Sequence, residues 1–266
     1  MSASRIAGLL LAATATVAIA QPAYKPPAAS AGEVSGVDFK SSQSLVALQE
    51  RFSTCDRTDI CDGTKLKKPY KCSSDPSRNT AILKLNGDII FYDGKMAIDA
   101  DGSALSKARG GTNLPETSWH YPTPPGGSVD AEHVPYIVLS KEFVAAKYGN
   151  LRQGVTIHTG DIAAVVYNGK TEYAIVADTG PACKIGEGSM RLHDELGNKA
   201  CADVGSNGIC KTASNNGIAK DVMFFVFPHS AALISKGLTP ANVGQRLNDE
   251  GPKLMQKLKD GSAPPK

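Results

Sequence analysis

The chain has 266 residues, of which 41% are hydrophobic and 21% are charged, and its 29 basic and 26 acidic residues give a formal net charge of +3. This near-balance excludes the strongly basic surface on which nucleic-acid binding depends, so we expect no nucleic-acid partner. It also gives no overall attraction for a cationic ligand. Any such preference must come from a local acidic cleft.

The first 20 residues have the pattern of a secretory signal peptide. Arg5 precedes an apolar run that begins with Ile6–Ala13, and Ala18-Ile19-Ala20 forms a small-x-small cleavage site. The apolar run is too short to span a membrane comfortably, and no second run follows it. We therefore predict a signal peptide over residues 1–20 and a secreted, extracellular protein with no membrane partner.

The mature chain is expected to form one catalytic domain behind a short tether. Residues 21–40 are rich in proline, alanine, serine and glycine, which predicts a flexible linker. The catalytic domain is expected over residues 41–260, and its first part, residues 41–78, contains a polar, lysine-rich segment that disulfides are expected to staple. We expect the protein to be a monomer.

Six cysteines support this single folded unit. They are Cys55, Cys61, Cys72, Cys183, Cys201 and Cys210. An even number in an oxidising compartment favours disulfides over free thiols, although six cysteines allow fifteen pairings. Because three lie before residue 73 and three after residue 182, complete pairing needs at least one bridge between the two halves.

The hydrophobic pattern predicts a mainly β fold. Apolar and β-branched runs predict strands at residues 82–85, 89–92, 136–139, 161–167, 171–177 and 222–227. Tight turns are expected at Asn86-Gly87-Asp88, at Asp93-Gly94-Lys95 and at Asn168-Gly169-Lys170. Helical spacing is found at residues 45–52 and 238–258, and loops are expected at 110–127 and 198–220. Many short strands with turns between them favour a compact barrel or sandwich with peripheral helices and long loops.

The stretch Tyr173–Leu192 carries the most chemical information. Its apolar strand is expected to stop at a turn, Asp178-Thr179-Gly180-Pro181, and Glu187 follows on a loop hinged by flanking glycines. Taken singly, Asp178 is typical of a turn-capping aspartate and Glu187 of a solvated loop charge. Together they are two carboxyl groups free to acquire different pKa values, which is the minimum equipment for acid–base hydrolysis.

Other chemistries find less support in the sequence. Asp178-Thr179-Gly180 also resembles an aspartic-peptidase triplet, but no second copy follows, as a pepsin-like chain would need. No G-x-S-x-G elbow is present, and no histidine pair has the HExxH spacing of a zinc hydrolase. The cysteine spacing matches no zinc site. We therefore expect no metal and no organic cofactor.

At this point the residues carry a family resemblance. The runs Val165–Gly169, Tyr173–Gly180 and Gly186-Glu187-Gly188-Ser189 resemble the core of the glycoside hydrolase family 75 chitosanases. That family has an Asp-Thr at the end of this strand and a Gly-Glu-Ala-Ser after a variable loop. The likeness extends to residues 96–102, 133–138 and 221–225, and so covers roughly residues 80–228, judged by eye. The chain departs from the family pattern at Gly180-Pro181, where Asn-Gly is frequent, and at Gly188, where alanine is usual.

The resemblance implies an enzyme that hydrolyses the β-1,4 bonds of chitosan with inversion at the anomeric carbon. It implies Asp178 and Glu187 as the catalytic pair, with Glu187 favoured as general acid and Asp178 as the base that activates water. From the residues alone, Asp99 and Asp101 share one face of a strand and are candidates to contact the cationic sugar. Trp119 and Tyr121 are candidates to stack on a sugar, although each is equally typical of a packing residue.

A second likeness concerns the fold. A hairpin that leads into an Asp-x-Gly-Pro turn resembles the double-psi β-barrels, which predicts a compact six-stranded barrel core. Proteins of that class include cell-wall-remodelling modules, so an exported glycan-binding protein without hydrolysis is the main alternative. A secreted aspartic peptidase is the weaker one.

Overall fold

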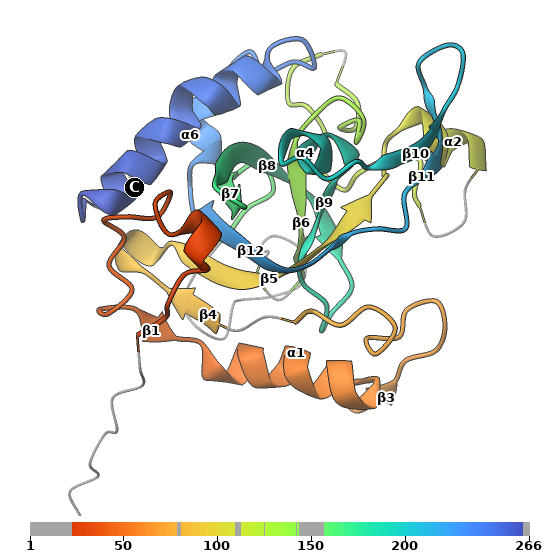
Figure 1. Cartoon of the computed structure of the whole chain (residues 1–266). Coiled ribbons are helices and arrows are strands. Elements are labelled where there is room, and N and C mark those ends of the chain that lie inside the picture. Colours follow the sequence, from red (N-terminus) through yellow and green to blue (C-terminus); the bar gives the residue numbers. More distant parts are fainter. Residues whose placement is uncertain are drawn as a thin grey trace, which may run out of the picture.

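The computed structural model describes residues 23–78, 81–109, 113–124, 126–141, 143 and 157–262, so the predicted signal peptide lies outside the described residues. Six strands close a mixed barrel (Figure 1). In order around the ring they are β5 (Ile90–Asp99), β12 (Ile218–Phe227), β7 (Ile162–Tyr167), β8 (Lys170–Gly180), β6 (Tyr136–Ser140) and β9 (Glu187–Ser189). Pairing between β9 and β5 completes the ring. The mainly β fold with a compact six-stranded barrel is confirmed.

Shorter elements surround the barrel. The strands β4 (Ala81–Lys84) and β1 (Gln43–Ser44) extend the sheet beside β5, and two small hairpins are formed by β2 (Ile60–Cys61) with β3 (Thr64–Lys65) and by β10 (Cys201–Val204) with β11 (Cys210–Ala213). The helices are α1 (Val46–Thr58), α2 (Ala104–Arg109), α4 (Met190–Glu195), α5 (Ala231–Ile234) and α6 (Val243–Lys259), with 3-10 turns η1 (Ala28–Ser30) and η2 (Asn86–Asp88). Among the described residues, no helix is long and apolar enough to cross a membrane.

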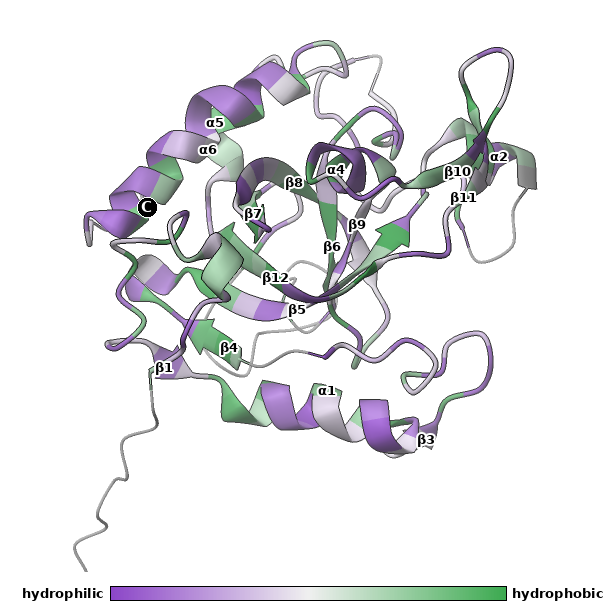
Figure 2. Cartoon of the chain, viewed as in Figure 1, coloured by the Kyte–Doolittle hydropathy of each residue, from purple (hydrophilic) through white to green (hydrophobic). Residues whose placement is uncertain are grey.

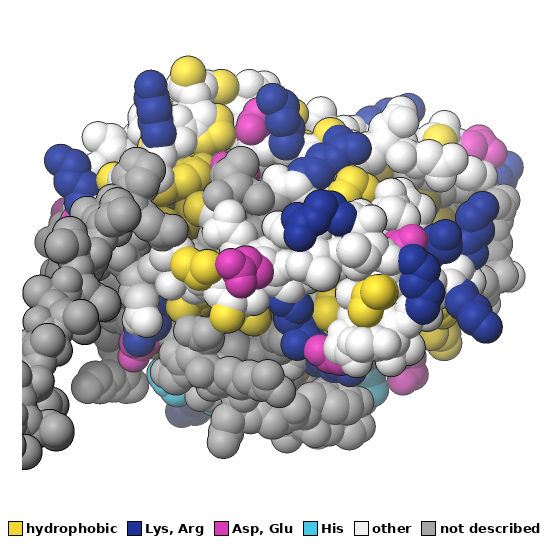
Figure 3. Space-filling model, turned by 90° about the horizontal axis from the view of Figure 1, so that it is seen from below, with side chains coloured by type: hydrophobic (Ala, Val, Ile, Leu, Met, Phe, Trp, Pro, Cys, Tyr) yellow, Lys and Arg dark blue, Asp and Glu magenta, His cyan; other side chains and the backbone are white. Residues whose placement is uncertain are grey.

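Two hydrophobic cores use opposite faces of the same strands. Side chains alternate along a strand, so Phe91 and Phe225 pack in the core that includes α6, whereas Tyr92 and Phe224 pack in the core that includes α1. Helix α6 buries its apolar side chains in the first core, and hydrophobic and hydrophilic residues alternate along its ribbon (Figure 2). The view from the α1 side shows basic side chains with acidic ones among them (Figure 3), in keeping with the balanced composition.

The N-terminal segment differs from its prediction. In residues 23–40, Val34 and Phe39 are buried, and the rings of Tyr24 and Phe39 lie 4.8 and 5.1 Å from that of Phe91. The expected flexible linker is therefore wrong for residues 23–40. A few apolar side chains within a proline- and alanine-rich segment are enough to bind it to the barrel.

The disulfides join distant parts of the chain as expected. Cys55 pairs with Cys72, Cys61 with Cys183, and Cys201 with Cys210. The second of these spans 122 residues and is the bridge between halves that the cysteine count required.

The strand and helix predictions are confirmed except at five places. Asp93-Gly94-Lys95 forms no turn, because β5 runs through it while pairing with β4 and β12. Residues 198–220 contain the β10–β11 hairpin rather than only loop. Strand β5 ends at Asp99, so Asp101 lies in the following turn and not on a strand with Asp99. Strand β8 continues through Asp178 to Gly180, and Glu187 begins a strand of its own. The corrections at Asp101, Asp178 and Glu187 matter for the site.

Candidate active site

Asp178 and Glu187 lie in register with the same residue. Strand β6 runs between β8 and β9, and its Val138 pairs with Asp178 on one side and with Glu187 on the other. Residues opposite one another in a ladder share a face of the sheet. With neighbouring strands about 4.8 Å apart, the two backbones stand roughly 9.6 Å apart, and both side chains rise from the same surface.

A break in the β6–β8 register places Asp178 there. Ile137 pairs with Val176 and Val138 with Asp178, so Ala177 is an extra residue on β8. Such a β-bulge re-aims the side chains that follow it. Without it, the strict alternation of the strand would put Asp178 on the same side as Val176.

Glu187 reaches across β6 toward the strand of its partner. A Cβ atom added at Gly180 would lie 4.0 Å from Glu187 Oε2 and 3.2 Å from Val138 Cγ1. Gly180 follows Asp178 by two residues, so the Glu187 carboxylate approaches the same end of β8. Because Glu187 pairs with both β5 and β6, the prediction that it lies on a glycine-hinged loop is wrong.

Asp99, Asp101 and Asp178 form an acid cluster. One carboxylate oxygen of each lies within 4.8 Å of the other two, and all three residues are buried. Their oxygens accept hydrogen bonds from neutral donors. Asp178 Oδ1 accepts from the backbone N–H groups of Ser118 (2.9 Å) and Thr179 (2.7 Å).

The other two aspartates have similar support. Asp99 accepts a hydrogen bond from the Tyr136 hydroxyl at 3.0 Å and another from the backbone N–H of Asp101 at 2.9 Å. Asp101 accepts from the backbone N–H of Leu114 at 2.6 Å. Each carboxylate is thus oriented, but no cation is bonded to it among the contacts of the described residues.

Burial and mutual repulsion raise the pKa values of two members of this cluster, Asp99 and Asp101. Burial first, and then the charges of Glu187, Asp101 and Asp178, hold the pKa of Asp99 well above its ordinary range. For Asp101, burial is again the largest cause, and together with Asp178 it raises the pKa to about 7 although the Leu114 N–H opposes the shift. Asp99 and Asp101 therefore keep protons at pH values where exposed aspartates have lost theirs.

The acid cluster lies on one side of Glu187, and two lysines lie on the other side. Lys95 of β5 is buried, and its Nζ lies 2.8 Å from Asp75 Oδ2; Lys184 Nζ lies 3.7 Å from the same oxygen. We call these three residues the ion triad. Burial raises the pKa of Glu187, the nearby lysines oppose this, and Asp75 and Asp178 add to it. A buried carboxyl with a raised pKa is suited to hold a proton for donation.

The two aromatic candidates stand beside β8. The Trp119 backbone N–H donates to the Ala177 carbonyl at 3.0 Å, and its half-buried ring lies edge-on to Tyr121, with ring centroids 5.4 Å apart. Tyr121 is only 4% exposed and offers almost no surface to a sugar. Trp119 therefore remains the stronger candidate for stacking, and Tyr121 packs behind it.

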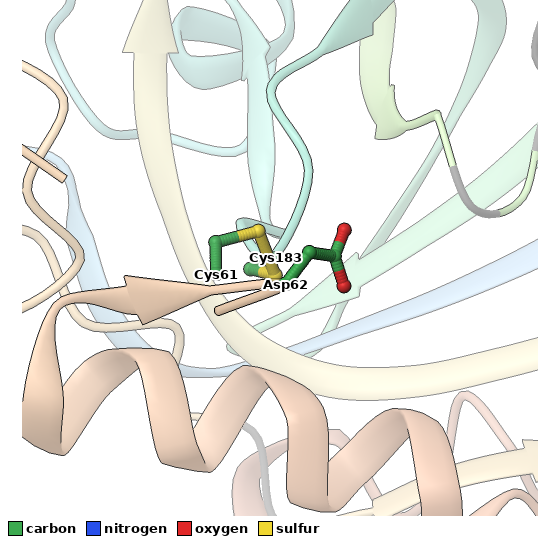
Figure 4. Close-up of side chains that lie close together, drawn as sticks. All are labelled: Cys61, Asp62 and Cys183. Atoms are coloured by element: carbon green, nitrogen blue, oxygen red, sulfur yellow. A yellow bond between two sulfur atoms is a disulfide. The ribbon is translucent and has the colours of Figure 1, made fainter. Parts of the chain in front are cut away.

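Within the part of the chain that the structure describes, two groups of side chains have the composition of metal ligands. Cys61, Asp62 and Cys183 lie together, but the two sulfur atoms are joined in a disulfide and offer no thiolate (Figure 4). The acid cluster presents oxygen atoms of the kind that hard cations prefer. Backbone or hydroxyl donors already engage an oxygen on each of its carboxylates. That the protein needs no metal remains a prediction.

Sequence reasoning paired Asp178 with Glu187 and Asp99 with Asp101, but it did not join the two pairs into one site. It also missed the ion triad. Asp75, Lys95 and Lys184 belong to segments far apart in the chain, and no local pattern marks them. The cysteines gave the only signal, because Asp75 lies three residues after Cys72 and Lys184 directly follows Cys183. Disulfides between these cysteine-containing segments would bring the two charged residues together.

Two carboxyls face each other across one strand, and burial raises the pKa of one of them, Glu187. Such a pair is typical of a hydrolase of the acid–base class. Comparison with known protein families then gives the group. Residues 96–257, more than half of the chain, match the family described as fungal chitosanase of glycosyl hydrolase group 75. The chain therefore belongs to glycoside hydrolase family 75. A search of curated protein sequences returned no match.

Proposed function

We propose that this protein hydrolyses the β-1,4 bonds of chitosan, cutting within the chain, with inversion at the anomeric carbon. The observation that carries the proposal is the shared register of Asp178 and Glu187 with Val138, which sets two carboxyls on one face with a strand between them. Inverting glycosidases need about 6.5–9.5 Å between the carboxyl groups, so that a water molecule fits. A backbone separation of roughly 9.6 Å, narrowed as Glu187 leans toward β8, suits that requirement.

In this mechanism Glu187 is the general acid and Asp178 the general base. Asp178 takes a proton from water as the water oxygen bonds to the anomeric carbon from the face opposite the leaving group. Glu187 gives its proton to the glycosidic oxygen as the bond between that oxygen and the anomeric carbon breaks. Both carboxyls then return to their starting protonation by exchange with solvent. The raised pKa of Glu187 supports its role as the acid.

The surroundings of the pair support a cationic substrate. Glucosamine units carry an ammonium group, and a cation that approaches the acid cluster favours the ionised form of its carboxyls. Asp99 and Asp101 are only 5% and 8% exposed, so we propose that they act on the sugar through the charge they gain when it binds more than by direct contact. Trp119 is proposed to stack on a neighbouring sugar.

The setting of the enzyme is part of the proposal. The predicted signal peptide, three disulfides and an extracellular polymer as substrate together support a secreted enzyme. We propose that residues 41–260 form its single catalytic domain, that the N-terminal segment packs on it, and that it acts as a monomer.

The deciding experiment incubates the purified mature protein with soluble chitosan and follows new reducing ends. We expect hydrolysis by the wild type and its loss in Asp178→Asn and Glu187→Gln, each checked for an unchanged circular dichroism spectrum. Proton NMR of the first products should show the α-anomer, as inversion requires. Chitosan depletion without new reducing ends would instead support a glycan-binding module. Cleavage of denatured casein, blocked by an aspartic-peptidase inhibitor, would support a peptidase.

A further inference from the structure

Glu187 stands between opposite charges. In the parallel β5–β9 ladder it lies directly across from Ala97, and Lys95 and Asp99 flank Ala97 at two residues on either side. Residues two apart on a strand point to the same face. Glu187 therefore has a lysine toward one end of its site and the acid cluster toward the other.

The lysine is held firmly. Lys95 is 5% exposed, and its ammonium group reaches Asp75 at 2.8 Å, while Lys184 shares the same carboxylate at 3.7 Å. The Asp75 carboxylate thus pairs with two ammonium groups, and the charge of Asp56 on α1 also acts on Lys95 and Asp75. A cavity of about 450 Å³ borders Asp75, Lys95 and Ala97, so water reaches the triad from that side.

Two disulfides brace the ion triad. The backbone N–H of Asp75 donates to the Cys72 carbonyl at 3.1 Å, and Cys72 is bonded to Cys55. Lys184 directly follows Cys183, which is bonded to Cys61. Cys72 Sγ also lies 3.6 Å from the Cys183 carbonyl oxygen, so the two braced segments touch. The charges of the triad therefore have fixed positions.

We propose that Lys95 is a positioning residue for Glu187: its buried ammonium group stabilises the Glu187 carboxylate that forms when the proton leaves, and Asp75 holds that ammonium group in place. This inference rests on the proposed role of Glu187 as general acid. The proton passes from Glu187 to the glycosidic oxygen, and Lys95 keeps all of its own protons throughout.

Charged groups face Glu187 from several of the elements around it, whereas β6, which also pairs with it, has no charged residue. Strand β5 contributes Lys95 and Asp99, the segment after Cys72 contributes Asp75, the chain before β9 contributes Lys184, and β8 contributes Asp178. Burial and the acidic groups favour the protonated form of Glu187. Only the lysines oppose them. Removing Lys95 and removing the charge of Asp75 must therefore change the proton affinity of Glu187 in opposite directions.

The test compares Lys95→Met with Asp75→Asn. A general acid must be protonated, so the fall of kcat at alkaline pH reports the pKa of Glu187 in the complex. We expect this alkaline limb to move up by about one pH unit in Lys95→Met and down by a similar amount in Asp75→Asn, roughly a tenfold change in proton affinity each. Loss of activity in both variants without opposite shifts would show a structural role only, and would overturn the inference.

A second readout does not require catalysis. ¹³C NMR of the glutamate Cδ carbons follows the titration of Glu187 directly, and its resonance is the one missing from Glu187→Gln. The two variants should move its midpoint in the same opposite directions. If they do so while the protein cleaves no chitosan, the proposed function fails but the coupling stands. If chitosan is cleaved and the midpoint is unmoved, the coupling is refuted.

Further variants guard against misfolding and non-specific effects. Lys184→Met removes the more distant lysine, so it should shift Glu187 in the same direction as Lys95→Met but by less. If Asp75→Asn does not fold, the comparison of Lys95→Met with Lys184→Met tests the proposal alone. Equal shifts of the Glu187 pKa in the two variants, or no shift in either, would contradict the closer position of Lys95. The matched control is Lys84→Met on β4, which breaks a 3.0 Å ion pair with Asp88 of η2 and should leave the titration of Glu187 unchanged.

Discussion

The two flanks of Glu187 both bury charged side chains, but they stabilise them differently. In the acid cluster, the partners of Asp99, Asp101 and Asp178 are neutral: backbone N–H groups and the hydroxyl of Tyr136. In the ion triad, the partners are ions of opposite sign, Asp75 with two lysines. Neutral donors orient a buried carboxylate without cancelling its charge, whereas a cation does both.

This difference accounts for the protonation of the site. In the acid cluster, which has no cation bonded to it, burial and repulsion hold the pKa of Asp99 well above its ordinary range and raise that of Asp101 to about 7. Glu187 borders both flanks, so its proton affinity is a balance between them. A general acid needs a raised pKa, yet it must still release its proton, and a position between an acidic and a basic group meets both needs.

The largest expected effect separates the roles of the two catalytic carboxyls. On chitosan, Glu187→Gln and Asp178→Asn should each lower kcat by about 10²–10⁴-fold, the usual contribution of a general acid or base. On a chitooligosaccharide with a dinitrophenyl leaving group, which departs without protonation, Glu187→Gln should recover most of its activity while Asp178→Asn should not. The measurement is release of dinitrophenolate under saturating substrate. Recovery by Asp178→Asn instead would exchange the two roles.

The second largest effect is expected from removing the Cys61–Cys183 disulfide, which braces the ion triad. Replacing Cys61 and Cys183 by serine frees a loop of 122 residues and should lower the free energy of unfolding by about 4–5 kcal/mol. The same change at Cys201 and Cys210 frees only 9 residues and should cost about 2–3 kcal/mol. Urea titrations at fixed pH measure both. The first variant should also disturb the Glu187 titration, whereas an undisturbed titration would show that the triad keeps its place without this bridge.

How much of this was visible in the sequence depends on the kind of contact. Apolar and β-branched runs predicted the strands, and apolar side chains at helical spacing predicted α6, because the local pattern determines which face is buried. Each half of the chain has an odd number of cysteines, so complete pairing required a disulfide between the halves, which Cys61–Cys183 provides. The placing of Glu187 on a loop was wrong, because flanking glycines are typical of loops and nothing local reveals that β5 and β6 both pair with it.

The composition of the site was harder to foresee. Asp99 joins Asp178 only because β9 connects β5 to β6 around the barrel, and this contact spans about eighty residues of sequence. The bulge at Ala177 turns Asp178 onto that face, and its sequence gives no sign of an extra residue. Lys95 was assigned to a turn, which hid its position on the face of Glu187. Such long-range juxtapositions follow from the closure of the barrel and not from any local pattern.

The smallest expected effect concerns the acid flank alone and is read in stability. Asp101 has a pKa of about 7 in the folded chain against an ordinary 3.8. Between these values the folded chain binds more protons than the unfolded chain, so this contribution to stability is complete below about pH 4 and is lost as the pH rises through about 7. Asparagine does not titrate. From pH 4 to pH 8, therefore, the wild type should lose up to about 4 kcal/mol relative to Asp101→Asn, a limit reduced by sharing of protons with Asp99 and Asp178. Urea unfolding across this range, with the exposed Asp88→Asn as control, measures the difference. Parallel curves for the wild type and Asp101→Asn would mean that Asp101 is ionised in the folded chain, and the contrast between the two flanks of Glu187 would then rest on Asp99 alone.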